Sequence, residues 1–188
     1  MIDKFLNAKH WQIFLLTMGL PIILQVIMTS MMFTNEDPTL MLRIMPIISI
    51  VFMVAFFGWF WSVAIGLQSK IPANINLRVN RFKIFISIPI LYIILIFGFM
   101  GTFMESTFEN GAEPSNAVIG SMLGIIIPIH LFSMFCIFYS LYFVAKTFKT
   151  AELQREVIFS DFAGEFFLFW FFPIGVWIIQ PKINKIME

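Results

Sequence analysis

The chain has 188 residues, of which 60% are hydrophobic and 12% are charged, and its formal net charge at pH 7 is +1. Soluble domains carry about 45–50% apolar and about 25% charged residues, so this composition excludes a water-soluble globule. A net charge near zero offers no electrostatic footprint for nucleic acid. The single cysteine, Cys136, excludes a disulfide framework within one chain.

Four stretches of the chain contain no Asp, Glu, Lys or Arg, and they predict membrane-spanning helices. These stretches are residues 12–33, 44–67, 84–104 and 117–145. About 20 apolar residues cross the roughly 30 Å hydrocarbon core as a helix, and in lipid a helix satisfies its own backbone polar groups. We therefore expect an all-α, polytopic membrane protein whose four-helix transmembrane bundle covers residues 1–145.

The Lys and Arg residues alternate along the chain with the acidic ones. Cations occur at the N-terminus, between the second and third stretches, and directly after the fourth stretch, whereas the connections 34–43 and 105–116 are acidic. Because cytoplasmic loops carry the excess of Lys and Arg, this alternation predicts a cytoplasmic N-terminus and two short outer loops. The expected location is the cell (inner or plasma) membrane.

Residues 146–188 are predicted to continue the fourth helix into the cytoplasm and then to return to the membrane. The run 166–179 is apolar and rich in aromatic residues, but its length is typical of a re-entrant or interfacial helix. A complete crossing would place Lys182 and Lys185 outside, against the charge rule, so we expect a cytoplasmic C-terminus. If the segment spans instead, Glu165 is buried, which makes it a candidate buried acid.

A polar stripe is predicted on the fourth helix. His130 lies near the middle of the stretch 117–145, and Ser133 and Ser140 share its helical face at i+3 and i+10. Such a stripe is what an ion or proton pathway needs, with Gln25 of the first stretch as the most obvious polar partner. The alternative is a neutral, structural histidine, which the lack of a carboxylate in the other long stretches favours.

Small residues recur at four-residue spacing on two of the predicted helices. Gly58, Ser62 and Gly66 lie on one face of the second helix, and Gly120 with Gly124 forms a GxxxG pair in the fourth. Small residues let helix backbones approach closely, which favours helix association in lipid. The pattern does not distinguish packing within one bundle from packing between subunits.

No motif of a known catalytic or nucleotide-binding site occurs in the chain, and no spacing of Cys or His residues indicates a metal site. We therefore expect neither an enzyme nor a bound cofactor. The sequence favours a small non-catalytic subunit of a homo- or hetero-oligomeric membrane complex, with the lipid bilayer and itself or other membrane subunits as partners. The alternative is a homo-oligomeric channel or transporter for an ion or small solute, lined by the fourth helix.

Overall fold

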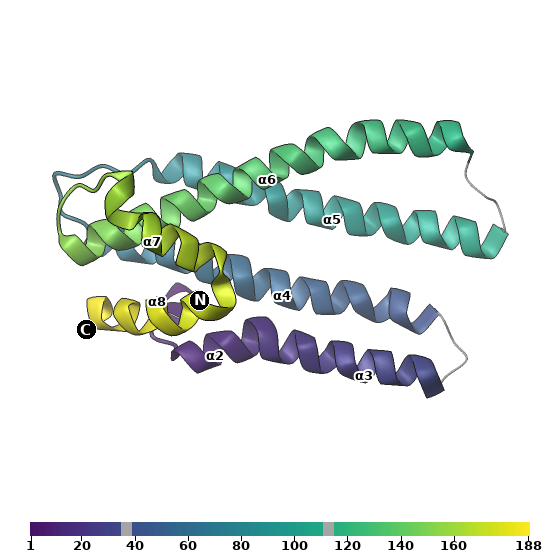
Figure 1. Cartoon of the computed structure of the whole chain (residues 1–188), viewed down its shortest axis with the longest axis horizontal. Coiled ribbons are helices and arrows are strands. Elements are labelled where there is room, and N and C mark those ends of the chain that lie inside the picture. Colours follow the sequence, from purple (N-terminus) through teal and green to yellow (C-terminus); the bar gives the residue numbers. More distant parts are fainter. Residues whose placement is uncertain (35–38, 111–114) are drawn as a thin grey trace. The chain divides into compact units, whose positions relative to one another are not determined.

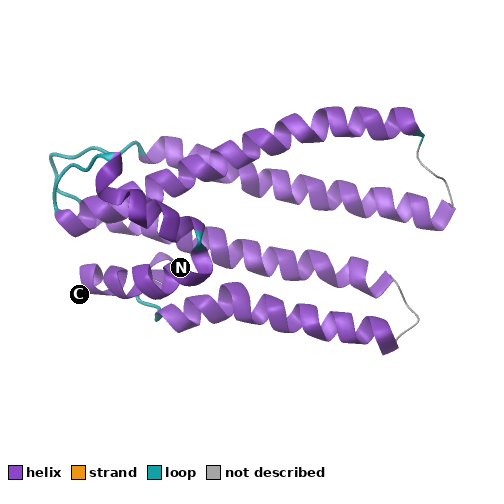
Figure 2. Cartoon of the chain, viewed as in Figure 1, coloured by secondary structure: helices purple, strands orange, loops and turns teal. Residues whose placement is uncertain are grey.

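A computed structural model describes residues 1–34, 39–110 and 115–188, and every regular element in these ranges is a helix (Figures 1 and 2). This confirms the expected all-α architecture. Residues 35–38 and 111–114 form the centres of the two acidic connections and lie outside the described residues, so the outer loops stay a prediction. Four helical segments in the described ranges are long and apolar enough to cross a membrane: His10–Met31, Pro46–Lys70, Val79–Phe99 and Ile119–Leu153.

The first of these segments is interrupted by a wider helical turn. It consists of α2 (His10–Phe14), a π-helical turn (Leu15–Gly19) and α3 (Leu20–Thr34). The proline of this segment, Pro21, follows the wide turn after one residue, and the carbonyl four residues before it is that of Thr17 in the turn. A proline lacks an N–H and its ring crowds the carbonyl four residues earlier, so a widened turn before it relieves the clash.

The other three long helices continue through their prolines. They are α4 (Thr39–Gly66), which ends in a short 3₁₀ turn (Leu67–Lys70), α5 (Val79–Asn110) and α6 (Asn116–Leu153). The helix α6 passes the end of the charge-free stretch at Ala145 without a break. The expected continuation of the fourth helix is therefore present, up to Leu153.

The chain forms two compact units, which are described separately. The first contains residues 1–80 and 141–188, and the second contains residues 81–140. The C-terminal segment belongs to the same unit as the first two spans, and the expected boundary at residue 145 stays a prediction. The helix α6 contributes its first part to the second unit and its last part to the first.

The first unit ends in a helical hairpin made by α7 (Phe159–Trp170) and α8 (Phe172–Met187) (Figure 1). The aromatic run is helical as expected, and it is divided at Phe171, whose ψ angle of 57° breaks the helix. The contact between α7 and α8 requires glycine at position 175 of α8, because a Cβ there would overlap the backbone carbonyl of Leu168 in α7. The two helices therefore pack closely against each other.

The core of the first unit is aromatic. Trp59 and Phe60 of α4 contact Phe169 of α7 and Phe172 of α8, with ring centroids 5.2 to 6.4 Å apart. Trp59 and Phe169 are completely buried. Because large aromatic side chains bury much apolar area, this cluster fixes the tip of the hairpin against the C-terminal half of α4.

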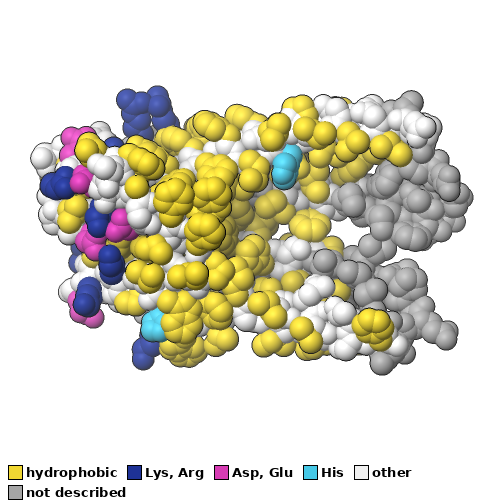
Figure 3. Space-filling view, in the orientation of Figure 1, with side chains coloured by type: hydrophobic (Ala, Val, Ile, Leu, Met, Phe, Trp, Pro, Cys, Tyr) yellow, Lys and Arg dark blue, Asp and Glu magenta, His cyan; other side chains and the backbone are white. Residues whose placement is uncertain are grey.

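The second unit is an antiparallel pair of helices. Phe85 of α5 contacts Phe135 and Tyr139 of α6, whereas Tyr92, further along α5, contacts His130, which lies earlier on α6. Many large apolar side chains of the chain are exposed, and hydrophobic atoms cover much of the visible face in Figure 3. Exposed apolar surface on long helices is what lipid as a solvent allows.

Candidate functional site

The polar residue at the middle of the fourth span has one recorded partner. The Nδ1 atom of His130 lies 3.1 Å from the hydroxyl of Tyr92 on α5, and both residues lie near the centres of their charge-free stretches. The imidazole of His130 is exposed, and Tyr92 is half-buried. The second unit therefore presents a hydrogen-bonded polar pair on a helix surface that is mostly apolar.

This pair leaves one ring nitrogen of His130 without a described partner. If the Tyr92 hydroxyl donates to Nδ1, the proton of the neutral ring lies on Nε2, and this N–H has no acceptor among the described residues. If Nδ1–H donates to the phenol oxygen, Nε2 is an unpaired acceptor instead. In both tautomers Nε2 of His130 can form one further hydrogen bond, directed away from Tyr92.

The other members of the predicted polar stripe have different surroundings. Ser133 and Ser140 are buried, whereas His130 is exposed. The hydroxyl of Ser140 donates to the carbonyl of Cys136, one turn earlier on the same helix. Gln25 lies on α3 in the other unit, so its pairing with His130 stays a prediction. The partner that the structure gives to His130 is Tyr92, which sequence reasoning missed.

The three small residues of α4 face the short N-terminal helix α1 (Ile2–Leu6). A Cβ at Gly58 would lie 3.1 Å from the ring of Phe5, and one at Gly66 would overlap the side chain of Leu6. Between them, the hydroxyl of Ser62 donates to the carbonyl of Gly58 at 2.7 Å, so it needs no other partner. This face of α4 is therefore occupied by the chain's own N-terminus.

The GxxxG pair of α6, in contrast to the small residues of α4, is not covered by another described part of the chain. Gly120 and Gly124 are exposed, and a Cβ at either position would meet nothing within 4 Å. The backbone of α6 is thus open at this point among the described residues. Of the two predicted small-residue faces, only this one can accept a helix from outside the chain without displacing part of it.

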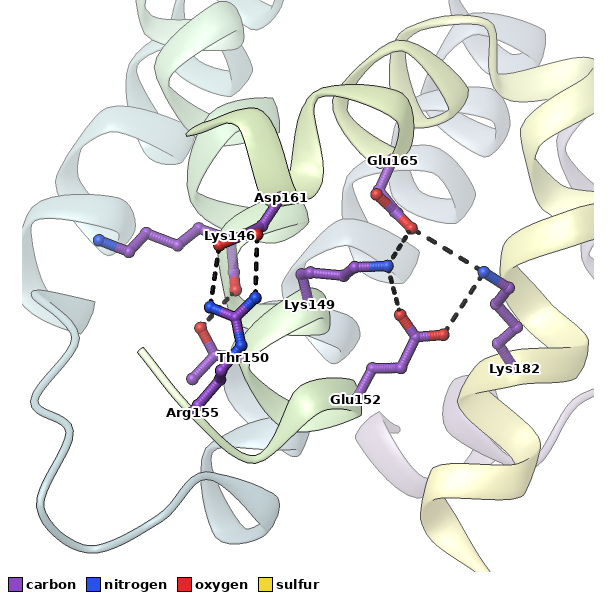
Figure 4. Close-up of polar contacts among 8 residues, drawn as sticks. All are labelled: Lys146, Lys149, Thr150, Glu152, Arg155, Asp161, Glu165 and Lys182. Carbon is purple, nitrogen blue, oxygen red and sulfur yellow. Dashed lines mark hydrogen bonds and ion pairs between the residues drawn. The ribbon is translucent and has the colours of Figure 1, made fainter. Parts of the chain in front are cut away.

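Glu165 of α7 is buried and forms part of a ring of four alternating charges (Figure 4). Lys149 of α6 donates to Glu152 at 2.7 Å and to Glu165 at 2.8 Å. Lys182 of α8 lies 3.4 Å from Glu152 and 3.8 Å from Glu165. We call these four residues the ion-pair ring. It joins α6, α7 and α8, and it neutralises the acid that the sequence singles out.

A second ion pair fixes the start of the hairpin. Arg155 donates two hydrogen bonds to the carboxylate of Asp161, which also accepts the backbone N–H of Ile158 at the N-terminus of α7. These hydrogen bonds, that of the Arg155 guanidinium first and that of Ile158 second, lower the pKa of Asp161 below its ordinary value. Both side chains lie at the surface beyond the end of α6.

Two amide side chains of α8 hold the N-terminal segment, and sequence reasoning missed both. The fully buried Gln180 accepts a hydrogen bond from the Trp59 indole at 2.7 Å and donates to the carbonyls of Phe5, Leu6 and Ala8. Asn184, one turn later, donates to two of the same carbonyls. The signal in the sequence was a pair of amides at i and i+4 in an apolar helix, where unpaired polar groups are costly.

Among the described residues, no group of three or more His, Cys, Asp or Glu side chains could hold a metal ion. Comparison with known protein families, with curated proteins and with solved structures finds no match for this chain. The four apolar helices define the class, which is that of helical, multi-pass membrane proteins.

Proposed function

We propose that this protein is a small non-catalytic subunit of an oligomeric membrane complex, and that it binds its neighbour through α5 and α6. The observation that supports this proposal is the exposed His130, hydrogen-bonded to the half-buried Tyr92 in the middle of two spans. The neighbour is a transmembrane helix of a second copy or of another subunit, which supplies the hydrogen-bonding group that Nε2 of His130 lacks.

The free energy of the Tyr92–His130 pair is lower when a partner helix covers it than when it faces lipid. An unsatisfied polar group in the hydrocarbon core costs several kcal/mol. A hydrogen bond between membrane helices stabilises their association by about 0.6 to 2 kcal/mol, and it removes the cost of the unsatisfied group. On the same helix, the open backbone at Gly120 and Gly124 allows close approach of a partner helix. Polar pairing and close packing are both available on α6.

The proposal includes a membrane topology for the chain. Both termini lie on the cytoplasmic side of the cell membrane, and the α7–α8 hairpin is re-entrant. The base of the hairpin is tied to the cation-rich end of α4, because Lys70 donates to the carbonyl of Met187. Its tip, at Phe172, contacts Phe56 of α4. Phe56 precedes Leu67 by 11 residues, which corresponds to about 16 Å of helix, or about half of a 30 Å hydrocarbon core.

The experiment compares assembly of the wild-type protein with that of His130→Leu, by native mass spectrometry of complexes from mild detergent. We expect the wild type to be oligomeric or to retain other subunits, and His130→Leu to dissociate. Ser87→Ala is the matched control, because Ser87 is an exposed polar residue whose hydroxyl bonds the carbonyls of its own helix at Lys83 and Ile84. A monomeric wild type, or unchanged assembly of His130→Leu, refutes the proposal.

The alternative function makes a different prediction for the same residue. In a homo-oligomeric channel or transporter lined by α6, His130→Ala abolishes flux of an ion or solute into liposomes while the oligomer persists. In a non-catalytic subunit, the same substitution weakens assembly. The two readouts therefore separate the two functions.

A further inference from the structure

Resting on the proposed function, we infer that the helix that covers His130 presents an oxygen acceptor to it, because Tyr92 makes this imidazole a hydrogen-bond donor. The hydroxyl of Tyr92 and Nδ1 of His130 are 3.1 Å apart. This contact involves two protons, one on the phenol and one on the neutral imidazole. The placement of these protons decides which kind of partner the pair can accept.

Only one placement of the two protons leaves a single group of the pair unpaired. When the Tyr92 hydroxyl donates to Nδ1, the ring proton lies on Nε2, and this N–H is then the one donor without an acceptor among the described residues. When Nδ1–H donates to the phenol oxygen instead, both the phenol O–H and Nε2 stay unpaired. Because each unpaired polar group is costly in hydrocarbon, the first placement is favoured. His130 therefore presents an Nε2–H donor.

The donor lies in an exposed apolar row of α6 that a partner helix can cover. Ile119, Leu123 and Met134 are 40%, 50% and 39% exposed. At 100° per residue these three side chains lie within about 40° of His130 around the helix. The row rises about 22 Å from Ile119 to Met134, which is most of the roughly 30 Å core. A helix packed along the row covers the imidazole, and the N–H selects among such helices.

The same proton count disfavours a second His130 as the partner. In a two-fold contact between two copies of α6, each imidazole would direct an N–H at the other. One ring would have to move its proton to Nδ1, and the hydroxyl of its Tyr92 would then lose its acceptor. The partner is therefore a helix other than a second α6, with a carboxylate, amide or hydroxyl oxygen on a side chain at mid-span depth.

The test offers the purified full-length protein three synthetic transmembrane peptides in phosphatidylcholine vesicles, with binding measured by energy transfer between labelled protein and labelled peptide. The peptides share one alanine–leucine host helix and differ in the central residue. Methionine sulfoxide is an acceptor without a donor, tryptophan is a donor without an acceptor, and leucine is neither. We expect the wild type to bind the sulfoxide peptide about 3- to 30-fold more tightly than the leucine peptide, which is the effect of one hydrogen bond between membrane helices.

Two variants trace this preference to the pair. His130→Leu should lose the preference for the sulfoxide peptide, because it has no donor. Tyr92→Phe keeps the imidazole but removes the hydroxyl that fixes its tautomer, so the ratio of sulfoxide to tryptophan peptide binding should fall. Tyr139→Phe is the matched control, because Tyr139 lies in the same unit and its hydroxyl has no hydrogen bond among the described residues. This control should keep the wild-type ratio.

Nitrogen NMR of the protein with isotopically labelled histidine reads the tautomer directly, and His10→Asn assigns the signals of the two histidines. We expect the proton on Nε2 in the wild type and a larger share on Nδ1 in Tyr92→Phe. A wild-type proton on Nδ1, equal binding of the sulfoxide and leucine peptides, or a Tyr92→Phe ratio equal to that of Tyr139→Phe overturns the inference. The proposed function fails separately, when His130→Leu assembles like the wild type in native mass spectrometry.

Discussion

Replacing Glu165 by glutamine perturbs the ion-pair ring without changing the size of the side chain. Glu165 lies 2.8 Å from the Lys149 ammonium, and the two side chains are only 11% and 17% exposed. In Glu165→Gln the amide oxygen can still accept a hydrogen bond from Lys149. The negative charge is lost, however, so Lys149 keeps only Glu152 as a counter-ion, at 2.7 Å.

The distance between Glu165 and Lys149 sets the size of the expected loss of stability. At 2.8 Å and an effective dielectric constant of about 20, two unit charges attract with about 6 kcal/mol, before the cost of removing them from water. Removing one partner of a buried pair typically costs 3–5 kcal/mol. Because Glu152 still neutralises Lys149, we expect a smaller loss of about 2 kcal/mol. For a chain of this size that corresponds to a fall in thermal midpoint of about 4–8 °C.

The assay is thermal unfolding in detergent at pH 7, with Asp161→Asn as the matched control. Its partner Arg155 is 56% exposed, and exposed ion pairs contribute little, so we expect a clearly smaller shift for this variant. A double-mutant cycle of Glu165→Gln with Lys149→Met measures the coupling energy directly. Equal shifts for Glu165→Gln and Asp161→Asn, or a coupling energy of zero, would show that the ring does not stabilise the hairpin.

Three further predictions concern the first unit. Gln180→Leu leaves the buried Trp59 N–H without its acceptor and should destabilise the protein by about 2–4 kcal/mol in thermal unfolding; a loss below 1 kcal/mol contradicts the buried hydrogen-bond cluster. Gly175→Ala should disrupt the hairpin turn and strongly lower the midpoint, whereas Gly164→Ala, where a Cβ meets nothing, should raise stability by up to about 1 kcal/mol; similar effects of the two would refute the close contact. The pKa of Asp161 is lowered in the folded protein, so its stabilising contribution is present above the ordinary pKa of about 4 and is lost as the pH falls through the folded value. On acidification the thermal midpoint of the wild type should therefore fall toward that of Asp161→Asn. A difference between the two midpoints that stays constant with pH would contradict this.

The fold class and the spans follow from the sequence alone, because the constraint that produces them is local. A stretch such as 84–104 without a charge must form a helix in lipid, where no water can satisfy its backbone. The sequence alone also shows that Glu165 lies beside an apolar run and that His130 lies at the middle of a charge-free stretch. These two residues could therefore be identified as unusual from the sequence, but their partners could not.

Partners were decided by the tertiary structure, because residues far apart in sequence meet only when helices pack. Tyr92 lies 38 residues from His130, and Gln180 lies 121 residues from Trp59. No periodicity within one helix encodes such a pairing. The small residues of α4 show the same distinction: their spacing indicates that something packs there, and only the packed chain shows that Leu6 of α1 fills the space at Gly66.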